Sequence, residues 1–209
     1  MTREDILQIA KPILFNTDMT VAIWLNRKTA TRRKAEFLKG KNPNWTGYIR
    51  DGLMLYNGTN EPCIKPPRYK VGDYLYVRET WCNANKPGCE PDYYYFADTR
   101  FCEDYDSTEW RWRPSIHMPK EAARIFLKVT DVRVERLQDI TFEGCLNEGA
   151  FVYLLADGYF DRNVIEPEAK RKFGIIWDST IPKNDLDKYG WAANPWIWVI
   201  EFERVEVQG

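Results

Sequence analysis

The sequence predicts an α+β domain built around a small, curved or barrel-like β-sheet. Segments with alternating apolar side chains, at 71–81, 124–137 and 195–207, are typical of strands. Short helical patterns separate them, and no internal repeat, low-complexity tract or linker divides the chain. A chain of 209 residues can bury one sizeable core, so we expect a single domain over 1–209.

The first predicted elements are a short strand and a short helix. The apolar run PILF at 12–15 is typical of a buried strand. Thr17 and Asp18 are candidate N-caps for a helix over 18–27, and Asn26 is a suitable stop because asparagine tolerates the left-handed conformation. The residues that follow are expected to be extended.

The stretch NRKTATRR at 26–33 concentrates cations around two threonines. In an extended segment, Thr29, Thr31 and Arg33 share one face. Arg32 and Arg33 then face opposite ways, so that only one can line a pocket while the other meets solvent or phosphate. Taken alone, the stretch fits a solvated turn, a phosphate-binding segment or the acid–base residues of an active site.

Irregular regions are predicted as insertions into the domain. Residues 34–69 are rich in Gly, Pro and Asn, which favours a peripheral excursion or lid over a separate folded core. A second insertion spans about 83–112 and contains DYYYFAD, which is typical of one strand of a hairpin.

The strand over 124–137 changes phase along its length. Apolar residues alternate inward from Ile125 to Val129, and the phase then moves to Val132 and Val134. Such a slip is typical of a bulge or sharp coil in a curved sheet.

Helices are predicted between this strand and the last one. Thr141 is a candidate cap for a short helix over 141–150, and Pro167 suits the first turn of a longer helix over 166–180. The apolar face of the longer helix contains Phe173, Ile176 and Trp177.

Charge and hydropathy limit the classes of function. Lys and Arg number 30 against 31 Asp and Glu, a net charge of -1, so any contact with nucleic acid has to come from a local patch. The charged start MTREDILQIA and the lack of a long apolar run disfavour a signal peptide or membrane span and favour the cytoplasm.

Metal and disulfide chemistry are not expected. The cysteines lack CxxC spacing and are odd in number, which favours free thiols in a reducing compartment. They are Cys63, Cys82, Cys89, Cys102 and Cys145. His117 is the single histidine of the sequence, which excludes a multi-histidine metal centre, and no cofactor is expected.

Strand phase identifies Glu79 as a candidate site residue. Within 74–81, the aliphatic side chains of Leu75 and Val77 share a face with Glu79 and Trp81, and this face is expected to point inward. A buried carboxylate is costly unless it is paired, hydrogen-bonded or protonated. A structural pair with an arginine or lysine and a functional role are equally favoured.

Lys28 and Thr31 are candidates to share a cavity with Glu79. A lysine acts as a general base when its pKa is lowered, and the neighbouring arginines favour that. A threonine hydroxyl becomes a nucleophile when such a base takes its proton.

The order of several longer motifs resembles ASCH-domain proteins, particularly the larger ones encoded by phages and prophages. The matching stretches include PILFNTDM, NRKTATRR, YKVGDYLYVRETW, RIFLKVTDVRVERLQDIT, FGIIWDST and NPWIWVIEFERV, and they cover most of the chain outside 34–66 and 83–108. The resemblance implies a PUA-like β-barrel, a fold associated with RNA, modified bases and nucleosides.

Some small ASCH proteins are similar to N4-acetylcytidine amidohydrolases, which use a lysine, a threonine three residues later and a glutamate from a following strand. The resemblance assigns these roles to Lys28, Thr31 and Glu79. This chain is longer, with insertions that could roof or block the pocket. Other ASCH members are similar to ribonucleases or are inferred to bind RNA.

Two hypotheses follow from the residues and the resemblance. In the first, the protein is an amidohydrolase that cleaves the linear amide of an N4-acylated cytidine-type nucleoside. In the second, it is a binding module for RNA or a modified nucleotide, with Arg32 and Arg33 on phosphate and Trp81 stacking a base. Asn194 is expected mainly to form a strand-entry turn and secondarily to line the pocket.

Overall fold

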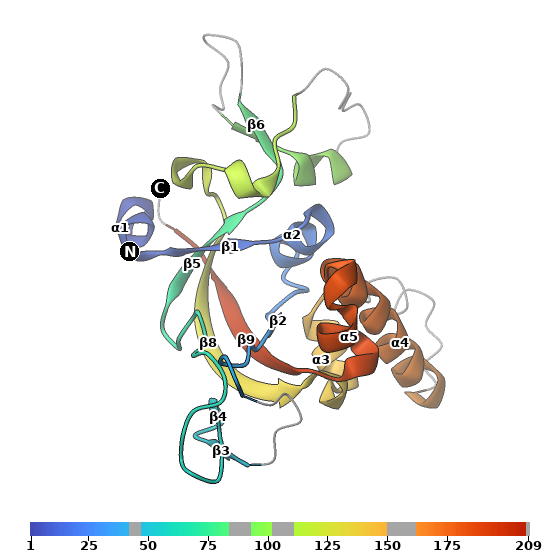
Figure 1. The fold of residues 1–209 in the computed structure, drawn as a ribbon. Helices are drawn as coiled ribbons and strands as arrows, with labels where there is room; N and C mark the ends of the chain where they lie inside the picture. Colours follow the sequence, from blue (N-terminus) through green and yellow to red (C-terminus); the bar gives the residue numbers. More distant parts are fainter. Residues whose placement is uncertain (42–46, 84–92, 102–110, 150–161, 208–209) are drawn as a thin grey trace. The chain divides into compact units, whose positions relative to one another are not determined.

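The structure is a computed structural model in which the chain divides into two compact units (Figure 1). It describes residues 1–41, 47–83, 93–101, 111–149 and 162–207. The first unit contains 1–28, 72–129 and 203–209. The second unit contains 29–71 and 130–202.

The first unit is built from short helices and short strands. Its elements are α1 (Arg3–Ile9), β1 (Lys11–Leu14), α2 (Thr17–Trp24), β5 (Tyr74–Arg78), β6 (Trp81–Asn83), β7 (Tyr93–Tyr95) and 3-10 helices at Phe96–Arg100, Ser115–His117 and Lys120–Ala122. Strand β1 pairs in parallel with β5, and β6 pairs with β7 in an antiparallel hairpin. The predicted strand in DYYYFAD is therefore confirmed.

The second unit combines a hairpin, several helices and the strand that carries the arginines. Its elements are β2 (Ala30–Lys34), β3 (Tyr48–Arg50), β4 (Met54–Tyr56), α3 (Phe142–Asn147), α4 (Arg162–Thr180), α5 (Leu186–Tyr189) and 3-10 helices at Leu137–Asp139, Lys183–Asp185 and Trp191–Ala193. A core under α3 and α4 contains Leu137, Ile140, Cys145, Ala169, Phe173, Trp177, Ile197 and Val199.

Strands β8 (Phe126–Arg136) and β9 (Trp196–Val205) run from one unit into the other. The strand order of the five-stranded sheet is β1-β5-β8-β9-β2. The α+β class is therefore confirmed. The described strands form no closed barrel, and a PUA-like barrel stays a prediction.

The predicted phase change in β8 is confirmed. Leu127 and Val129 are buried, Thr130 is exposed, and burial resumes at Val132 and Val134. The slip falls where β8 passes from the first unit to the second.

Strand β9 does not alternate as its sequence predicts. Every residue from Trp196 to Ile200 is buried. Ile197 and Val199 belong to the core under α3 and α4, and the alternate residues Trp198 and Ile200 are buried on the opposite face, so both faces of this part of the strand are covered.

The predicted stop of α2 and the predicted cap of α3 are confirmed, whereas the predicted cap of α2 is wrong. The cap of α2 is Asn16, whose Oδ1 accepts from the backbone N of Met19 at 2.9 Å, instead of the two residues after it. Asn26 takes the predicted left-handed conformation with φ 55°. Thr141 caps α3 as predicted, accepting from the backbone N of Gly144 at 3.0 Å.

Helix α4 begins at Arg162, upstream of the predicted start, and Pro167 therefore lies inside the helix. Buried side chains recur every fourth residue from Ile165 to Trp177. Burial of this stripe stabilises the helix on the N-terminal side of the proline as well, although proline removes one backbone donor.

The region predicted as the first insertion belongs to the second unit. Its hairpin of β3 and β4 is followed by the buried Ile64, and the backbone N of Val134 donates to the carbonyl of Gly52 at 2.8 Å. Most of the second predicted insertion lies outside the described residues, and the single domain stays a prediction. No described helix has the length and apolar character needed to cross a bilayer.

Candidate functional site

Strand β2 presents successive side chains to opposite faces. Thr31 lies opposite Ile200 of β9, and Arg33 lies opposite Trp198, so these residues share one face of the β2–β9 ladder. Arg32 faces the other way, toward the core of the second unit. The predicted separation of the two arginines is confirmed.

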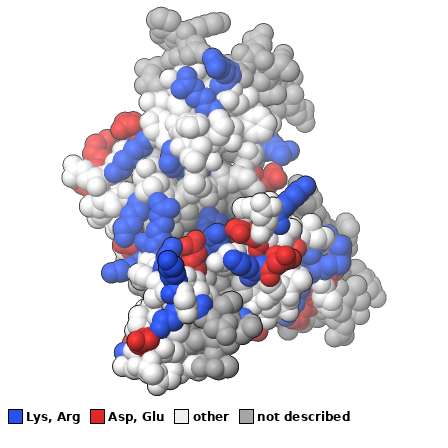
Figure 2. All heavy atoms as spheres, viewed as in Figure 1, with Lys and Arg blue, Asp and Glu red and all other residues white. Residues whose placement is uncertain are grey.

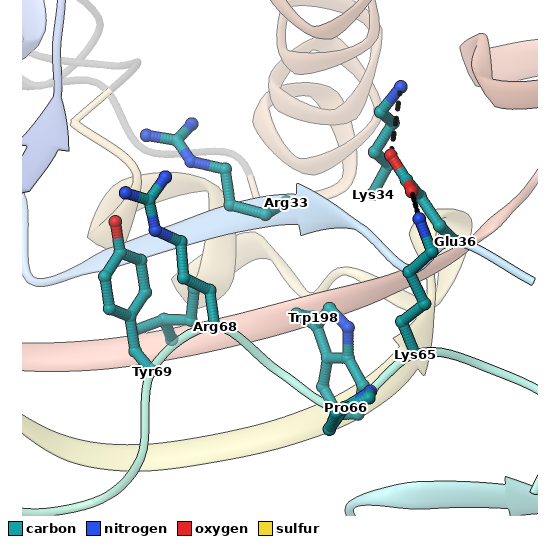
Figure 3. A pocket seen from close by; sticks show the side chains of 9 residues that line it. Arg33, Lys34, Glu36, Lys65, Pro66, Arg68, Tyr69 and Trp198 are labelled. Atoms are coloured by element: carbon teal, nitrogen blue, oxygen red, sulfur yellow. Dashed lines mark hydrogen bonds and ion pairs between the residues drawn. The ribbon is translucent and has the colours of Figure 1, made fainter.

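The face of Arg33 borders a pocket of about 250 Å³ in the second unit (Figure 3). Strand β2, the segment before β5 and strand β9 supply its walls. The lining residues are Arg33, Lys34, Glu36, Lys65, Pro66, Arg68, Tyr69, Trp198 and Ile200.

The two lysines of the pocket form ion pairs with carboxylates. Lys65 Nζ lies 2.6 Å from Glu36 Oε2, and this hydrogen bond lowers the pKa of Glu36. Lys34 Nζ lies 3.6 Å from Glu36 Oε1 and 3.9 Å from Asp185 Oδ2. Arg68 forms no ion pair with a carboxylate of the described residues.

Arg33 is half-buried and lies in the field of a second guanidinium. Burial lowers the pKa of Arg33, the Glu148 carboxylate and the Tyr69 phenol oppose this, and Arg68 lowers it further. An arginine side chain stays protonated in proteins, because its charge is delocalised over the whole guanidinium group. Two like charges therefore persist in the same pocket.

One wall of the pocket is apolar. Figure 3 shows the Trp198 indole beside Pro66 in the part of the pocket away from the Arg33 and Arg68 guanidinium groups. Ile200 extends this wall. The pocket therefore offers cations at one part and an aromatic surface at another.

Arg32 is buried, with 5% of its surface exposed. Its Nη1 lies 3.1 Å from Glu148 Oε1, its Nη2 lies 3.9 Å from Glu135 Oε2, and its guanidinium carbon lies 5.8 Å from the ring centroid of Phe173. Contrary to the prediction of solvent or phosphate contact, this arginine meets a buried carboxylate. Arg32 therefore ties β2 to the end of α3.

Glu79 points inward as its strand phase predicts, with 1% of its surface exposed. Arg124 donates from Nε to Oε1 at 3.0 Å and from Nη2 to Oε2 at 3.1 Å, and its Nη1 donates to Asp98 at 2.9 Å. Burial raises the pKa of Glu79, and the hydrogen bonds from Arg124 oppose that rise. Glu79 and Arg124 therefore form the buried ion pair that the structural interpretation of Glu79 requires.

Lys28 and Thr31 are also buried, at 2% and 1% exposure. Lys28 Nζ lies 5.6 Å from the ring centroid of Phe15. Lys28 and Glu79 belong to the first unit, whereas Thr31 belongs to the second. Convergence of these three side chains on one site stays a prediction.

The remaining predicted binding residues have structural contacts. Trp81 is in the core of the first unit, with its ring centroid 5.7 Å from that of Tyr93. Asn194 has φ 45° and accepts from the backbone N of Gln138 at 2.8 Å, which confirms the strand-entry turn. Neither residue lines the pocket of the second unit. Base stacking by Trp81 stays a prediction.

Sequence reasoning missed the pocket wall formed by 65–69 and by Trp198. The basic and proline residues of IKPPRY were a usable signal, because paired prolines stiffen a segment that also carries cations. Trp198 lies in a strand that was predicted correctly. Its pairing with Arg33 across the sheet could not be predicted from the sequence of either strand.

Thiol and metal chemistry find little support in the described part of the chain. Cys63, Cys82 and Cys145 are buried free thiols, and burial raises the pKa of Cys145 to about 11. Cys89 and Cys102 lie outside the described residues. Within the described ranges, no group of three metal-binding side chains is placed to hold an ion.

Comparisons with protein-family models, with curated proteins and with solved structures found no match. The ASCH resemblance therefore remains a prediction. The site has to be interpreted from its own chemistry.

Proposed function

We propose that the protein binds a phosphate-bearing nucleotide, free or within RNA, in the pocket of the second unit, and that its fold is of the PUA-like ASCH type. The observation that supports this most is the combination of Arg33 and Arg68 with the Trp198 wall. Guanidinium groups bind phosphate oxygens through paired hydrogen bonds, and aromatic rings stack on bases.

A local site is consistent with the charge distribution of the protein. Figure 2 shows more basic than acidic surface on the face in view, with acidic side chains among the basic ones. The net charge of -1 provides no long-range field for duplex binding. A single nucleotide pocket needs only a few charges, which the cations around Arg33 supply.

Binding to a short single-stranded RNA tests the proposal. Fluorescence anisotropy would compare the protein with its Arg33→Gln and Arg68→Gln variants across a salt series. Each variant is expected to weaken binding about tenfold and to lower the salt slope by roughly 0.7 per lost phosphate contact. Arg171→Gln is the matched control, because Arg171 is exposed on α4 and pairs with Glu168.

Equal affinity of all four proteins, or binding that is insensitive to salt, would show that the pocket does not hold phosphate. Circular dichroism of each variant checks that the fold is retained. Because Arg68 is exposed, its substitution is not expected to destabilise the protein.

A second candidate function is hydrolysis of an N4-acylated cytidine-type nucleoside. The observation in its favour is that Lys28, Thr31 and Glu79 are among the few buried polar residues of the described chain. In this mechanism neutral Lys28 takes the proton of Thr31, whose hydroxyl attacks the acyl carbonyl. Glu79 would help carry this proton to the leaving nitrogen as the C–N bond breaks, and water would then hydrolyse the acyl ester on Thr31 to release the carboxylic acid. The Arg124 ion pair accounts for the burial of Glu79 without catalysis, which places this function second.

Turnover distinguishes the two functions. The purified protein is incubated with N4-acetylcytidine, and cytidine is measured by chromatography. Hydrolysis that disappears in Lys28→Met and Thr31→Val variants would favour the enzyme. If the unmodified protein produces no cytidine, the binding function remains the proposal.

A further inference from the structure

The hairpin of β3 and β4 carries a cluster of aromatic and basic side chains outside the pocket. Tyr48 lies opposite Tyr56 in the ladder, and Arg50 follows Tyr48 by two residues, so all three side chains project from one face of the hairpin. The other face contains Leu55, which is fully buried. Figure 1 shows the hairpin away from helices α3, α4 and α5 of the same unit.

The planar groups of this cluster lie over one another. The ring centroids of Tyr48 and Tyr56 are 5.7 Å apart, and the ring planes differ by 13°. The guanidinium carbon of Arg50 lies 4.4 Å from the Tyr56 centroid and 5.9 Å from the Tyr48 centroid. Tyr48 is 42% exposed, so part of its ring is accessible to a ligand. Aromatic rings stack on nucleic-acid bases, and every base offers a face for such stacking.

A hydrogen-bonded turn holds the two exposed side chains in position. Asn57 Oδ1 accepts from the backbone N of Glu61 at 2.8 Å, which closes the turn after β4. Asn60 in this turn has φ 63°, and its Oδ1 accepts from the Tyr48 hydroxyl and from Arg50 Nη2. Arg50 Nη2 also donates to the Tyr48 hydroxyl at 3.2 Å. Side chains that are fixed before binding lose less conformational entropy when a ligand arrives.

Arg50 offers a positive charge and hydrogen-bond donors to a ligand. Within the described chain its contacts are with a phenol, an amide oxygen and two rings, all of them neutral. The nearby Glu61 carboxylate is occupied by Lys41, whose Nζ lies 2.6 Å from Oε2. Asp51 follows Arg50 in the sequence but forms no ion pair with it. An exposed guanidinium of this kind binds phosphate oxygens.

A stacking ring beside a guanidinium matches the repeating unit of a single nucleic-acid strand, in which each base adjoins a phosphodiester. Sites for single strands combine the same two elements, aromatic side chains for the bases and cations for the backbone. Bases inside a duplex are stacked on one another and have no free face for a side chain. The cluster therefore favours an unpaired strand over a duplex.

We propose that this face of the β3–β4 hairpin binds single-stranded nucleic acid, with a base stacked on Tyr48 and an adjoining phosphate on Arg50. The inference goes beyond the proposed function, because the hairpin face is a second contact surface that does not require the pocket.

Fluorescence anisotropy with a labelled oligouridine of about ten nucleotides tests this inference. Tyr48→Leu keeps an apolar side chain but removes the ring, and is expected to weaken binding at least about fivefold. Tyr48→Phe keeps the ring and should retain the affinity. Arg50→Gln removes the charge, and should weaken binding and lower the salt slope by roughly 0.7.

Arg171→Gln is the matched control, because Arg171 is exposed elsewhere in the second unit and pairs with Glu168. Its affinity for the oligouridine should equal that of the unmodified protein. Urea unfolding shows whether each variant is folded. If Tyr48→Leu fails to fold, Arg50→Gln keeps the test valid, because it retains both rings of the hairpin.

Two further probes define the ligand. An oligodeoxythymidine of the same length distinguishes the two kinds of strand: hairpin-dependent binding of RNA alone assigns the face to RNA, and hairpin-dependent binding of both assigns it to single strands in general. A duplex of the same length should bind more weakly than either strand. A duplex that binds as tightly as the single strand would overturn the inference.

The remaining outcomes separate the hairpin from the pocket. Oligouridine affinity that falls in the Tyr48 and Arg50 variants but not in Arg33→Gln and Arg68→Gln would support this inference and overturn the proposed function. The reverse pattern would leave the pocket and overturn the inference. Equal losses in Tyr48→Phe and Tyr48→Leu would also overturn it, because the ring would then not be what the strand contacts.

No affinity of the unmodified protein for any of these strands would likewise overturn the inference. The cluster of Tyr48, Arg50 and Tyr56 would in that case only stabilise the hairpin.

Discussion

Replacing Glu148 by glutamine should destabilise the protein, because it leaves the Arg32 guanidinium buried without its main counter-charge. The side chains of Arg32 and Glu148 are 4% and 6% exposed and approach to 3.1 Å. Breaking a buried ion pair costs about 3–5 kcal/mol. Glu135 lies 3.9 Å from Arg32 and retains part of the compensation, so we expect a loss of about 3 kcal/mol.

Urea unfolding followed by circular dichroism measures this loss. With a slope of roughly 2 kcal/mol/M, the midpoint should fall by about 1.5 M. Glu168→Gln is the matched control, since its ion pair with Arg171 is on the surface and should be worth about 0–1 kcal/mol. If Glu148→Gln unfolds at the same urea concentration as the control, Arg32 is not held in the core, and the division of roles between Arg32 and Arg33 is wrong.

Further predictions concern the first unit. Arg124→Gln removes both hydrogen bonds to Glu79, so the pKa of Glu79, already raised by burial, should rise further. Between the unfolded pKa and this raised folded pKa, the folded state binds more protons, and stability falls as pH rises. The urea midpoint of the variant, relative to the unmodified protein, should therefore be lower at pH 7 than at pH 4, and an equal deficit at both would contradict the reasoning. Trp81→Phe should lower stability by roughly 1–3 kcal/mol without changing RNA affinity, because the indole is in the core. Unchanged stability with lost affinity would instead favour base stacking by Trp81.

Features set by local periodicity could be predicted from the sequence. The inward direction of Glu79 followed from its phase with Leu75 and Val77, because strand side chains alternate with period two. The opposite directions of Arg32 and Arg33 followed from the same rule.

Features set by distant contacts could not be predicted. The partner of Glu79 is Arg124, 45 residues away, and the partner of Arg32 is Glu148, 116 residues away. No local pattern indicates such pairs. The start of α4 was missed because burial of Ile165 outweighs the local signal of Pro167.

The pocket itself combines predictable and unpredictable parts. Strand β2 contributes Arg33, which belongs to the cation-rich stretch NRKTATRR, for which the sequence left a solvated turn, a phosphate-binding segment and part of an active site open. Arg68 and Pro66 come from a segment without periodicity, whose irregular composition indicated only an insertion. The pocket wall forms only in the folded chain, where this segment and β9 border the same space.

The most direct test of phosphate binding by Arg33 and Arg68 is a titration of the arginine Nε–Hε resonances by ¹H–¹⁵N NMR with 5′-phosphorylated UpU. Assignment uses the Arg32, Arg33 and Arg68 glutamine variants. The account predicts that the Arg33 and Arg68 signals shift together and saturate with one ligand, while the Arg32 signal, protected by Glu148, stays in place. A saturable shift of Arg32 with no change at Arg33 and Arg68 would contradict it.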